Sequence, residues 1–461
     1  MKSKGGKTPN VRQLFGTDGI RGKANAYPIT AEVAMQLGRA LVAVLKDFSK
    51  QPRIIIGKDT RLSGYMLENA LTAGITSMGG YALLLGPLPT PAVAYLIRGM
   101  RAQGGVMISA SHNPYQDNGL KVFGSDGFKL DDALEARLEK LMTSLNEITS
   151  LTPTPENLGR ARRIDDALGR YLTNLKTIFR RDFDLSGMRI VFDGANGAAY
   201  DCGRKLFEEL GATVTAMACE PNGTNINADC AQANPKLLSE KVLETGSDIG
   251  IGVDGDADRL LVVDEKGHLI SGEHILFALA SFLRDSGRLL GDGMVTTTMA
   301  NQALEVALKK ERIRIERTQV GDRYVVEAMK KGGFILGGET SGHFIFADQN
   351  TTADGLFSAL EVLALVKKRK IKVSELRRSF DLFPQKLVSI RVKEKKPIEE
   401  LPTLAKSIRK LEEKYKNSGR VNVRYSGTEL VLRVMLEGPD SKIVEKDVSE
   451  LAKLVEREIG A

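Results

Sequence analysis

The chain has 461 residues, of which 42% are hydrophobic and 27% are charged. That length predicts about three domains with substantial buried cores, and the composition excludes a largely disordered chain, a collagen-like repeat and a small disulfide scaffold. The formal net charge is only +8. Because the basic clusters lie far apart and lack interleaved aromatic residues, no nucleic-acid partner is expected.

The expected compartment is the cytoplasm. Cys202, Cys219 and Cys230 form no CxxC pair, and three scattered cysteines are typical of a reducing environment. Residues 1–10 lack the apolar segment of a signal peptide. No apolar run approaches the roughly 18 residues that a membrane span requires, so no membrane association is expected.

Short hydrophobic runs with strand character alternate with segments of helical periodicity. In the first third of the chain, strands are predicted at residues 53–57, 80–85 and 105–109, with a helix at 65–77. Further strands are predicted at residues 189–192, 212–216, 248–253 and 334–336. This alternation is typical of parallel α/β sheets. Ligands of such sheets bind in loops beyond the carboxyl ends of strands, so those loops are examined for functional residues.

Two breaks interrupt the alternation of predicted strands and helices. Residues 150–158 are rich in Pro and Thr and predict a loop near a domain edge. A second break lies at 383–397. The segment after it is predicted to form a small α+β domain, with a strand at 387–392, a charged helix at 401–416, strands at 419–425 and 430–436, and a terminal helix.

The first polar loop holds Ser111 between small and polar residues, directly after a predicted strand. An exposed nucleophile has such neighbours. A Ser–His–Asp hydrolase is disfavoured, because His112 is the adjacent residue and no GxSxG elbow is present. A Ser/Asn/Pro turn without chemistry remains an alternative.

The second loop holds Asp254, Asp256 and Asp258, three carboxylates at a spacing of two residues. Such a set can converge on one hard cation, and Mg²⁺ prefers oxygen ligands. A calcium-binding EF-hand is disfavoured because Arg259 stands where that loop needs Gly. A solvated acidic turn remains an alternative.

The third loop, residues 337–343, combines glycines with Glu339, Ser341 and His343. These side chains suit the hydroxyl groups of a sugar, although many Gly-rich turns have a similar composition. The loop therefore supports a sugar-binding site only in combination with the other loops.

The fourth loop offers one guanidinium and two hydroxyl groups to a phosphate, with a second arginine nearby. These residues are Arg424, Ser426, Gly427, Thr428 and Arg433. Arg433 is equally well explained as a solvated strand residue. Arg21 and Lys121 complete the basic groups, although each taken alone is more typical of a surface charge. Together, the loops predict phosphoryl transfer on a phosphorylated sugar or polyol.

These loops, in this order, resemble those of the α-D-phosphohexomutase superfamily over essentially the whole chain. Residues 15–22, 57–68, 86–96, 221–227 and 320–325 support the likeness. The resemblance implies an α/β fold, with three related α/β domains around a central cleft followed by a smaller α+β phosphate-binding domain. The expected bounds are 1–158, 159–268, 269–384 and 385–461.

The resemblance also implies roles for individual residues. Ser111 is expected as a phosphoserine whose phosphoryl oxygen joins the three aspartates around one Mg²⁺ per subunit. Glu339 and Ser341 would bind sugar hydroxyls, and the fourth loop would bind the phosphate that does not react. The residues expected around the transferring group are Arg21, His112, Lys121, Arg259 and His343. The general base is left open between Lys121 and His343.

The implied reaction interconverts glucosamine 6-phosphate and glucosamine 1-phosphate through a sugar 1,6-bisphosphate. The alternative is a phosphomannomutase or phosphoglucomutase acting on plain hexose phosphates; a second alternative is an inactive hexose-phosphate-binding regulator. Asp322 and Arg323 stand where the plain-hexose branch has a histidine, which favours the amino sugar. Ala257 stands where many members have Gly. A monomer or a homodimer is expected.

Overall fold

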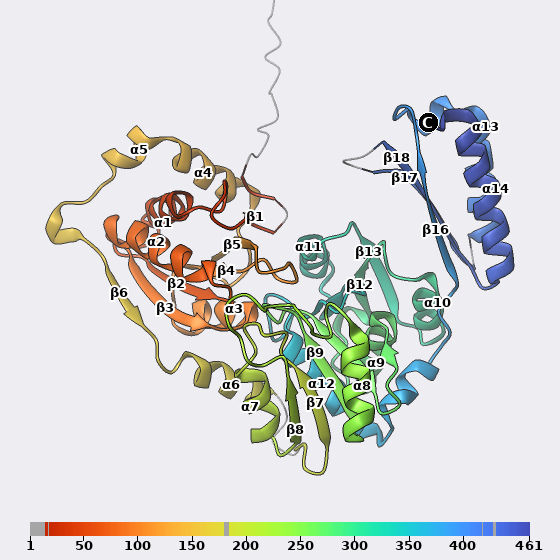
Figure 1. The fold of residues 1–461 in the computed structure, drawn as a ribbon, viewed down its shortest axis with the longest axis horizontal. Coiled ribbons are helices and arrows are strands. Elements are labelled where there is room, and N and C mark those ends of the chain that lie inside the picture. Colours follow the sequence, from red (N-terminus) through yellow and green to blue (C-terminus); the bar gives the residue numbers. More distant parts are fainter. Residues whose placement is uncertain (1–13, 17, 179–183, 417, 427–429) are drawn as a thin grey trace, which may run out of the picture.

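The computed structural model describes residues 14–16, 18–178, 184–416, 418–426 and 430–461. It contains four β-sheets of six, five, four and three strands, in chain order. Figure 1 shows the first three sheets with their helices grouped together and the fourth standing beside the third. The predicted architecture of three α/β domains followed by a smaller α+β domain is confirmed.

The first sheet has the strand order β1-β5-β4-β2-β3-β6. Its strands are β1 (Ile20–Lys23), β2 (Arg53–Lys58), β3 (Tyr81–Pro87), β4 (Gly104–Ile108), β5 (Asp117–Gly124) and β6 (Arg160–Arg163). Its helices are α1 (Ala31–Leu45), α2 (Ser63–Ser77), α3 (Thr90–Gly99), α4 (Asp132–Thr143) and α5 (Leu145–Ser150). The basic cluster at β6 is an edge strand, and charged side chains at an edge discourage further strand addition.

The second and third sheets repeat this arrangement. The second has β7 (Arg189–Asp193), β8 (Thr213–Met217), β9 (Ile249–Val253), β10 (Leu260–Asp264) and β11 (Leu269–Ile270), with α6 (Ala167–Ile178), α7 (Cys202–Glu209) and α8 (Pro235–Thr245). The third has β12 (Gly293–Thr297), β13 (Arg314–Thr318), β14 (Leu336–Gly338) and β15 (Phe344–Phe346), with α9 (Gly272–Asp285), α10 (Gln302–Lys310), α11 (Asp322–Gly332) and α12 (Gly355–Arg369). The orders β5-β4-β2-β3, β10-β9-β7-β8 and β15-β14-β12-β13 are the same.

The sheets contain the expected parallel strands but are mixed, and one antiparallel pair recurs in each of the three α/β domains. A parallel strand is followed by a short return strand, giving the antiparallel hairpins β4–β5, β9–β10 and β14–β15. The loops of these hairpins are the first three motifs of the sequence. β9, for example, is buried on both faces. Hydrophobic packing on both sides fixes this strand, and the fixed strand holds the loop that follows it in place.

The fourth domain has an antiparallel sheet of β16 (Gln385–Arg391), β17 (Arg420–Tyr425) and β18 (Val431–Glu437), covered by α13 (Pro402–Tyr415) and α14 (Ser441–Ile459). At its junction with the third domain, the buried Glu437 accepts a hydrogen bond from the backbone nitrogen of Gln302 at 2.5 Å. Arg420 donates to the carbonyl of Thr298. Among the described residues, no helix has the length and apolar character needed to cross a membrane.

Candidate active site

A cleft with a volume of about 530 Å³ is lined by all three α/β domains. Of the residues predicted from the sequence, those at its wall are Arg21, Ser111, Asp258, Arg259, Glu339 and His343. The three hairpin loops therefore converge on one space, as the sequence predicts. His112 and Ser341, both exposed, are not among the lining residues.

Ser111 is buried, and its backbone lies in the left-handed region with φ of +52°. Its hydroxyl donates a hydrogen bond to Oδ2 of Asp254 at 2.6 Å, and its backbone nitrogen donates to Oγ of Ser109 at 2.9 Å. A non-glycine residue in this conformation carries strain of about 1–3 kcal/mol, which persists only where surrounding contacts enforce it. The geometry thus holds the hydroxyl against the acidic loop.

Arg61 and Asn227 supply those contacts, and sequence reasoning did not single out either. Arg61, fully buried, donates to the carbonyls of Ser111 at 2.9 Å and Asn113 at 2.8 Å. Asn227 donates to the same two carbonyls at 2.8 and 2.9 Å. The guanidinium is anchored by Asp59, with Nε 2.9 Å from Oδ2. Both residues fall inside stretches that carry the family resemblance, which is the signal that marks them.

Replacing Arg61 with Met is expected to destabilise the protein by about 3–5 kcal/mol, because it leaves the buried Asp59 carboxylate without its partner. Urea denaturation followed by circular dichroism measures this. The double variant Arg61→Met/Asp59→Asn is the matched control, and it is expected to recover part of the loss. A loss below about 1 kcal/mol in the single variant would contradict a structural role for this ion pair.

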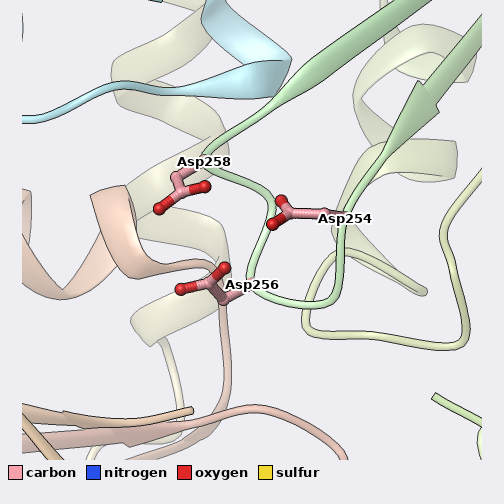
Figure 2. A group of neighbouring side chains, drawn as sticks. All are labelled: Asp254, Asp256 and Asp258. Atoms are coloured by element: carbon pink, nitrogen blue, oxygen red, sulfur yellow. The ribbon is translucent and has the colours of Figure 1, made fainter. Parts of the chain in front are cut away.

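The acidic loop joins β9 and β10 and gathers its three carboxylates. Ligand atoms of Asp254, Asp256 and Asp258 all lie within 4.8 Å of one another, and all three residues are buried. Figure 2 shows the carboxylates facing a shared space. Ala257 has a φ of +57°, a backbone conformation that Gly adopts more readily.

The charges of this loop are only partly balanced by protein groups. Burial and the charges of Asp258 and Asp256 raise the pKa of Asp254 well above its usual range. One oxygen of Asp256 and one of Asp258 are buried without a hydrogen-bond partner among the described residues. Three close carboxylates with unsatisfied oxygens fit a hard divalent cation such as Mg²⁺, which would neutralise them and use those oxygens as ligands.

Lys121 lies beside this triad on β5. Its Nζ is 2.7 Å from Oδ2 of Asp256, 3.4 Å from Oδ2 of Asp18 and 3.7 Å from Oδ2 of Asp258. Burial acts to lower the pKa of Lys121, but the neighbouring carboxylates, Asp18 foremost, raise it above its usual range. Burial likewise acts to raise the pKa of Asp256, but the Lys121 ammonium and its hydrogen bond lower it to about 2. Both groups are therefore charged at neutral pH.

The third loop turns between β14 and β15. Glu339 accepts a hydrogen bond from the backbone nitrogen of Gly321 at 3.1 Å. Nε2 of His343 lies 3.8 Å from Oδ2 of Asp258 and 3.9 Å from Oδ2 of Asp322. His343 is buried, and its Nδ1 has no hydrogen-bond partner among the described residues.

The described residues of the fourth loop are not part of this cleft wall. Arg424 on β17 is paired directly with Arg433 on β18, which places two guanidinium groups on one face of the hairpin. Like charges in such cross-strand positions repel, so an anion would stabilise them. Ser426 is buried, and its nitrogen donates to the carbonyl of Val431 at 2.8 Å. Gly427 and Thr428 lie outside the described residues.

Sequence reasoning missed a second set of charged residues at the cleft rim. Asp18 contacts Arg21, Lys121 and Lys129, and Lys129 also contacts Asp322. Asp18 and Lys129 belong to the first domain and Asp322 to the third. Nothing in the spacing of these residues indicates that they meet, because the contact forms only when the two domains pack together.

Comparison with known proteins gives four family matches, one for each domain. They are the phosphoglucomutase/phosphomannomutase alpha/beta/alpha domains I, II and III, at residues 12–149, 169–267 and 271–383, and the C-terminal domain of the same family, at residues 387–454.

Full-length relatives agree with these family matches. The phosphoglucosamine mutase of Pelobacter propionicus is 54% identical over 451 residues, covering 98% of this chain and 99% of the relative. That of Geobacter sp. strain M21 is 52% identical over 450 residues, with the same coverage.

Solved structures share the fold at lower identity. A phosphoglucomutase/phosphomannomutase family protein from Burkholderia thailandensis has a TM-score of 0.76 at 20% identity, covering 96% of this chain and 99% of that chain. The N-acetylphosphoglucosamine mutase of Aspergillus fumigatus, in complex with GlcNAc-6P and magnesium, has a TM-score of 0.64 at 19% identity, covering 97% and 96%.

Proposed function

Since the chain belongs to the phosphoglucomutase/phosphomannomutase family, we propose that it is a phosphoglucosamine mutase, an isomerase that interconverts glucosamine 6-phosphate and glucosamine 1-phosphate. Its full-length relatives at about half identity carry that name. The observation that carries the proposal is the Ser111 hydroxyl held 2.6 Å from Asp254, within a cleft lined by the matching loops of three domains.

In this proposal Ser111 carries the phosphoryl group. A sugar hydroxyl oxygen bonds to phosphorus as the bond from phosphorus to the Ser111 oxygen breaks, which gives a sugar 1,6-bisphosphate. The bisphosphate then turns over in the cleft and returns its other phosphoryl group to Ser111. Phosphoryl transfer depends chiefly on positioning and charge stabilisation. The buried Ser111 hydroxyl, held in a fixed conformation, provides the positioning.

Asp254, Asp256 and Asp258 would hold Mg²⁺ together with a phosphoryl oxygen on Ser111. When bound, this cation offsets the negative charge of the phosphoryl group. Arg21 and Arg259 at the cleft wall, and the buried Lys121 beside Asp256, add positive charge. His112 follows Ser111 directly and borders this group. Burial and the charges of Arg259 and Arg21 lower its pKa, so the neutral imidazole is favoured.

The proton of the attacking hydroxyl needs an acceptor. Lys121 is held as an ammonium by its carboxylate neighbours, so it would act as a fixed charge. We assign the base role to His343, which lines the cleft, because a nitrogen of a neutral imidazole can accept a proton.

The sugar and its second phosphate would be bound by the third and fourth loops. Glu339 lines the cleft and would accept hydrogen bonds from sugar hydroxyls, with Ser341 on the same turn. Arg424, Ser426 and Arg433, with Gly427 and Thr428, would bind the phosphate that does not react. A phosphate between Arg424 and Arg433 would remove their repulsion.

The test is a comparison of kcat/KM for glucosamine 6-phosphate, glucose 6-phosphate and mannose 6-phosphate, with Mg²⁺ and a glucose 1,6-bisphosphate primer. The expected result is the highest kcat/KM with glucosamine 6-phosphate. A higher value with either plain hexose phosphate would assign the chain to the alternative branch. Binding without turnover of any of the three would indicate a regulator.

A further inference from the structure

Lys129 connects the first and third domains at the rim of the cleft. It follows β5, and its Nζ lies 2.5 Å from Oδ2 of Asp322, the first residue of α11. The same nitrogen contacts Oδ1 of Asp18 in the first domain. The three side chains are 18–24% exposed, so the bridge is largely shielded from water, where ion pairs are stronger than at an open surface.

The bridge keeps two like charges together. Asp18 and Asp322 contact one nitrogen atom and therefore lie close to each other across the domain boundary. Arg21 and Lys121 compensate Asp18 in part, and Nε2 of His343 lies 3.9 Å from Asp322. Lys129 is the cation that contacts both carboxylates, so its removal would leave them repelling each other across the boundary.

The other described contacts of this boundary include a second ion pair, between Arg323 of α11 and Asp132 of α4, and further polar contacts. Oγ1 of Thr351 donates to the carbonyl of Gly127 at 2.7 Å, and Nζ of Lys330 lies 3.1 Å from the ring centroid of Phe128. A cavity of about 240 Å³ beside Lys129 is lined by both domains. Among these described contacts, the Lys129 bridge is the one whose loss would leave the carboxylates of Asp18 and Asp322 facing each other across the boundary.

The bridge also joins two groups of functional residues. Asp18 contacts Lys121, which contacts the acidic loop. On the other side, Asp322 follows Gly321, whose nitrogen holds Glu339. Lys129 thus couples the loop proposed to bind the sugar to the charges proposed to surround the transferring phosphoryl group.

We propose that Lys129 is a positioning residue that holds the first and third domains together around the sugar 1,6-bisphosphate, so that the intermediate is retained between its two phosphoryl transfers. This inference rests on the proposed function, since only a mutase must keep an intermediate that is not covalently attached. An open boundary would let the bisphosphate escape before it returns a phosphoryl group to Ser111.

The test measures bisphosphate binding without turnover. Glucose 1,6-bisphosphate is titrated calorimetrically, with Mg²⁺, into Ser111→Ala protein and into the same protein carrying Lys129→Met, Lys129→Arg or Lys330→Met. We expect Lys129→Met to raise Kd about tenfold or more, Lys129→Arg to restore most of the affinity, and Lys330→Met to have little effect. Lys330→Met is the matched control because it removes a lysine at the same boundary that contacts no carboxylate in the described structure.

A second readout uses turnover in proteins that retain Ser111. Lys129→Met is expected to raise the primer concentration needed for half-maximal rate by a similar factor. Unchanged affinity in Lys129→Met, or an equal loss in Lys330→Met, would overturn the inference. Failure of the Ser111→Ala parent to bind the bisphosphate would instead contradict the proposed function.

Discussion

Replacing Ser111 with Ala is expected to abolish phosphosugar isomerisation, with kcat reduced by about 10⁴-fold or more. The substitution removes the oxygen that accepts and donates the phosphoryl group, and no other serine or threonine lies in the described part of the cleft wall. The backbone of the loop remains held by Arg61 and Asn227, so the protein is expected to fold. A steady-state assay with glucosamine 6-phosphate, Mg²⁺ and primer measures the effect.

Ser109→Ala is the matched control within the same loop. Ser109 donates to Asp59 at 2.6 Å and accepts from the nitrogen of Ser111, so its loss perturbs the position of the nucleophile without removing it. A decrease of about ten- to a hundredfold is expected. Comparable activity of Ser111→Ala and wild type would show that Ser111 is not the nucleophile.

Asp258→Asn is expected to lower kcat by about 10³-fold and to remove most of the stabilisation that Mg²⁺ gives the wild type. In EDTA, three clustered carboxylates repel one another in the wild type, and the variant has one charge fewer. The variant is therefore expected to have the higher Tm in EDTA. Mg²⁺ is expected to stabilise only the wild type appreciably, by about 2.7 kcal/mol at a concentration of one hundred times Kd.

Thermal denaturation in EDTA and in Mg²⁺, run on both proteins, separates these expectations. An equal rise of Tm in both proteins would place the cation elsewhere. A lower Tm of the variant in EDTA would mean that Asp258 stabilises the fold through its contact with Lys121 more than it destabilises the fold through repulsion.

Much of the cleft could be predicted from the sequence because its loops follow strands with strong hydrophobic patterns. The strand predicted at 53–57 is β2 (Arg53–Lys58) and that at 248–253 is β9 (Ile249–Val253). The strand predicted at 334–336 lies two residues later in the structure, as β14 (Leu336–Gly338). Gly337 and Gly338 have low strand propensity, but both are paired with neighbouring strands of the sheet. Local sequence thus indicated which loops follow these strands and line the cleft.

Contacts between domains could not be predicted in this way. Lys129 and Asp322 are separated by 193 residues, and neither lies in a pattern that specifies a partner. The fully buried Arg61 resembles a surface arginine in sequence, because burial of a charge depends on partners supplied by a distant loop. Charge pairing across domains is a property of the assembled fold.

The most direct test of the account is a single turnover with phosphorylated enzyme. The protein is phosphorylated with glucose 1,6-bisphosphate, the modified residue is located by peptide mass spectrometry, and glucosamine 6-phosphate is then added with Mg²⁺. We predict one phosphate on the peptide that contains Ser111 and its transfer to the amino sugar to give glucosamine 1,6-bisphosphate. Phosphate on another residue, or a phosphoserine that does not react with glucosamine 6-phosphate, would contradict the account.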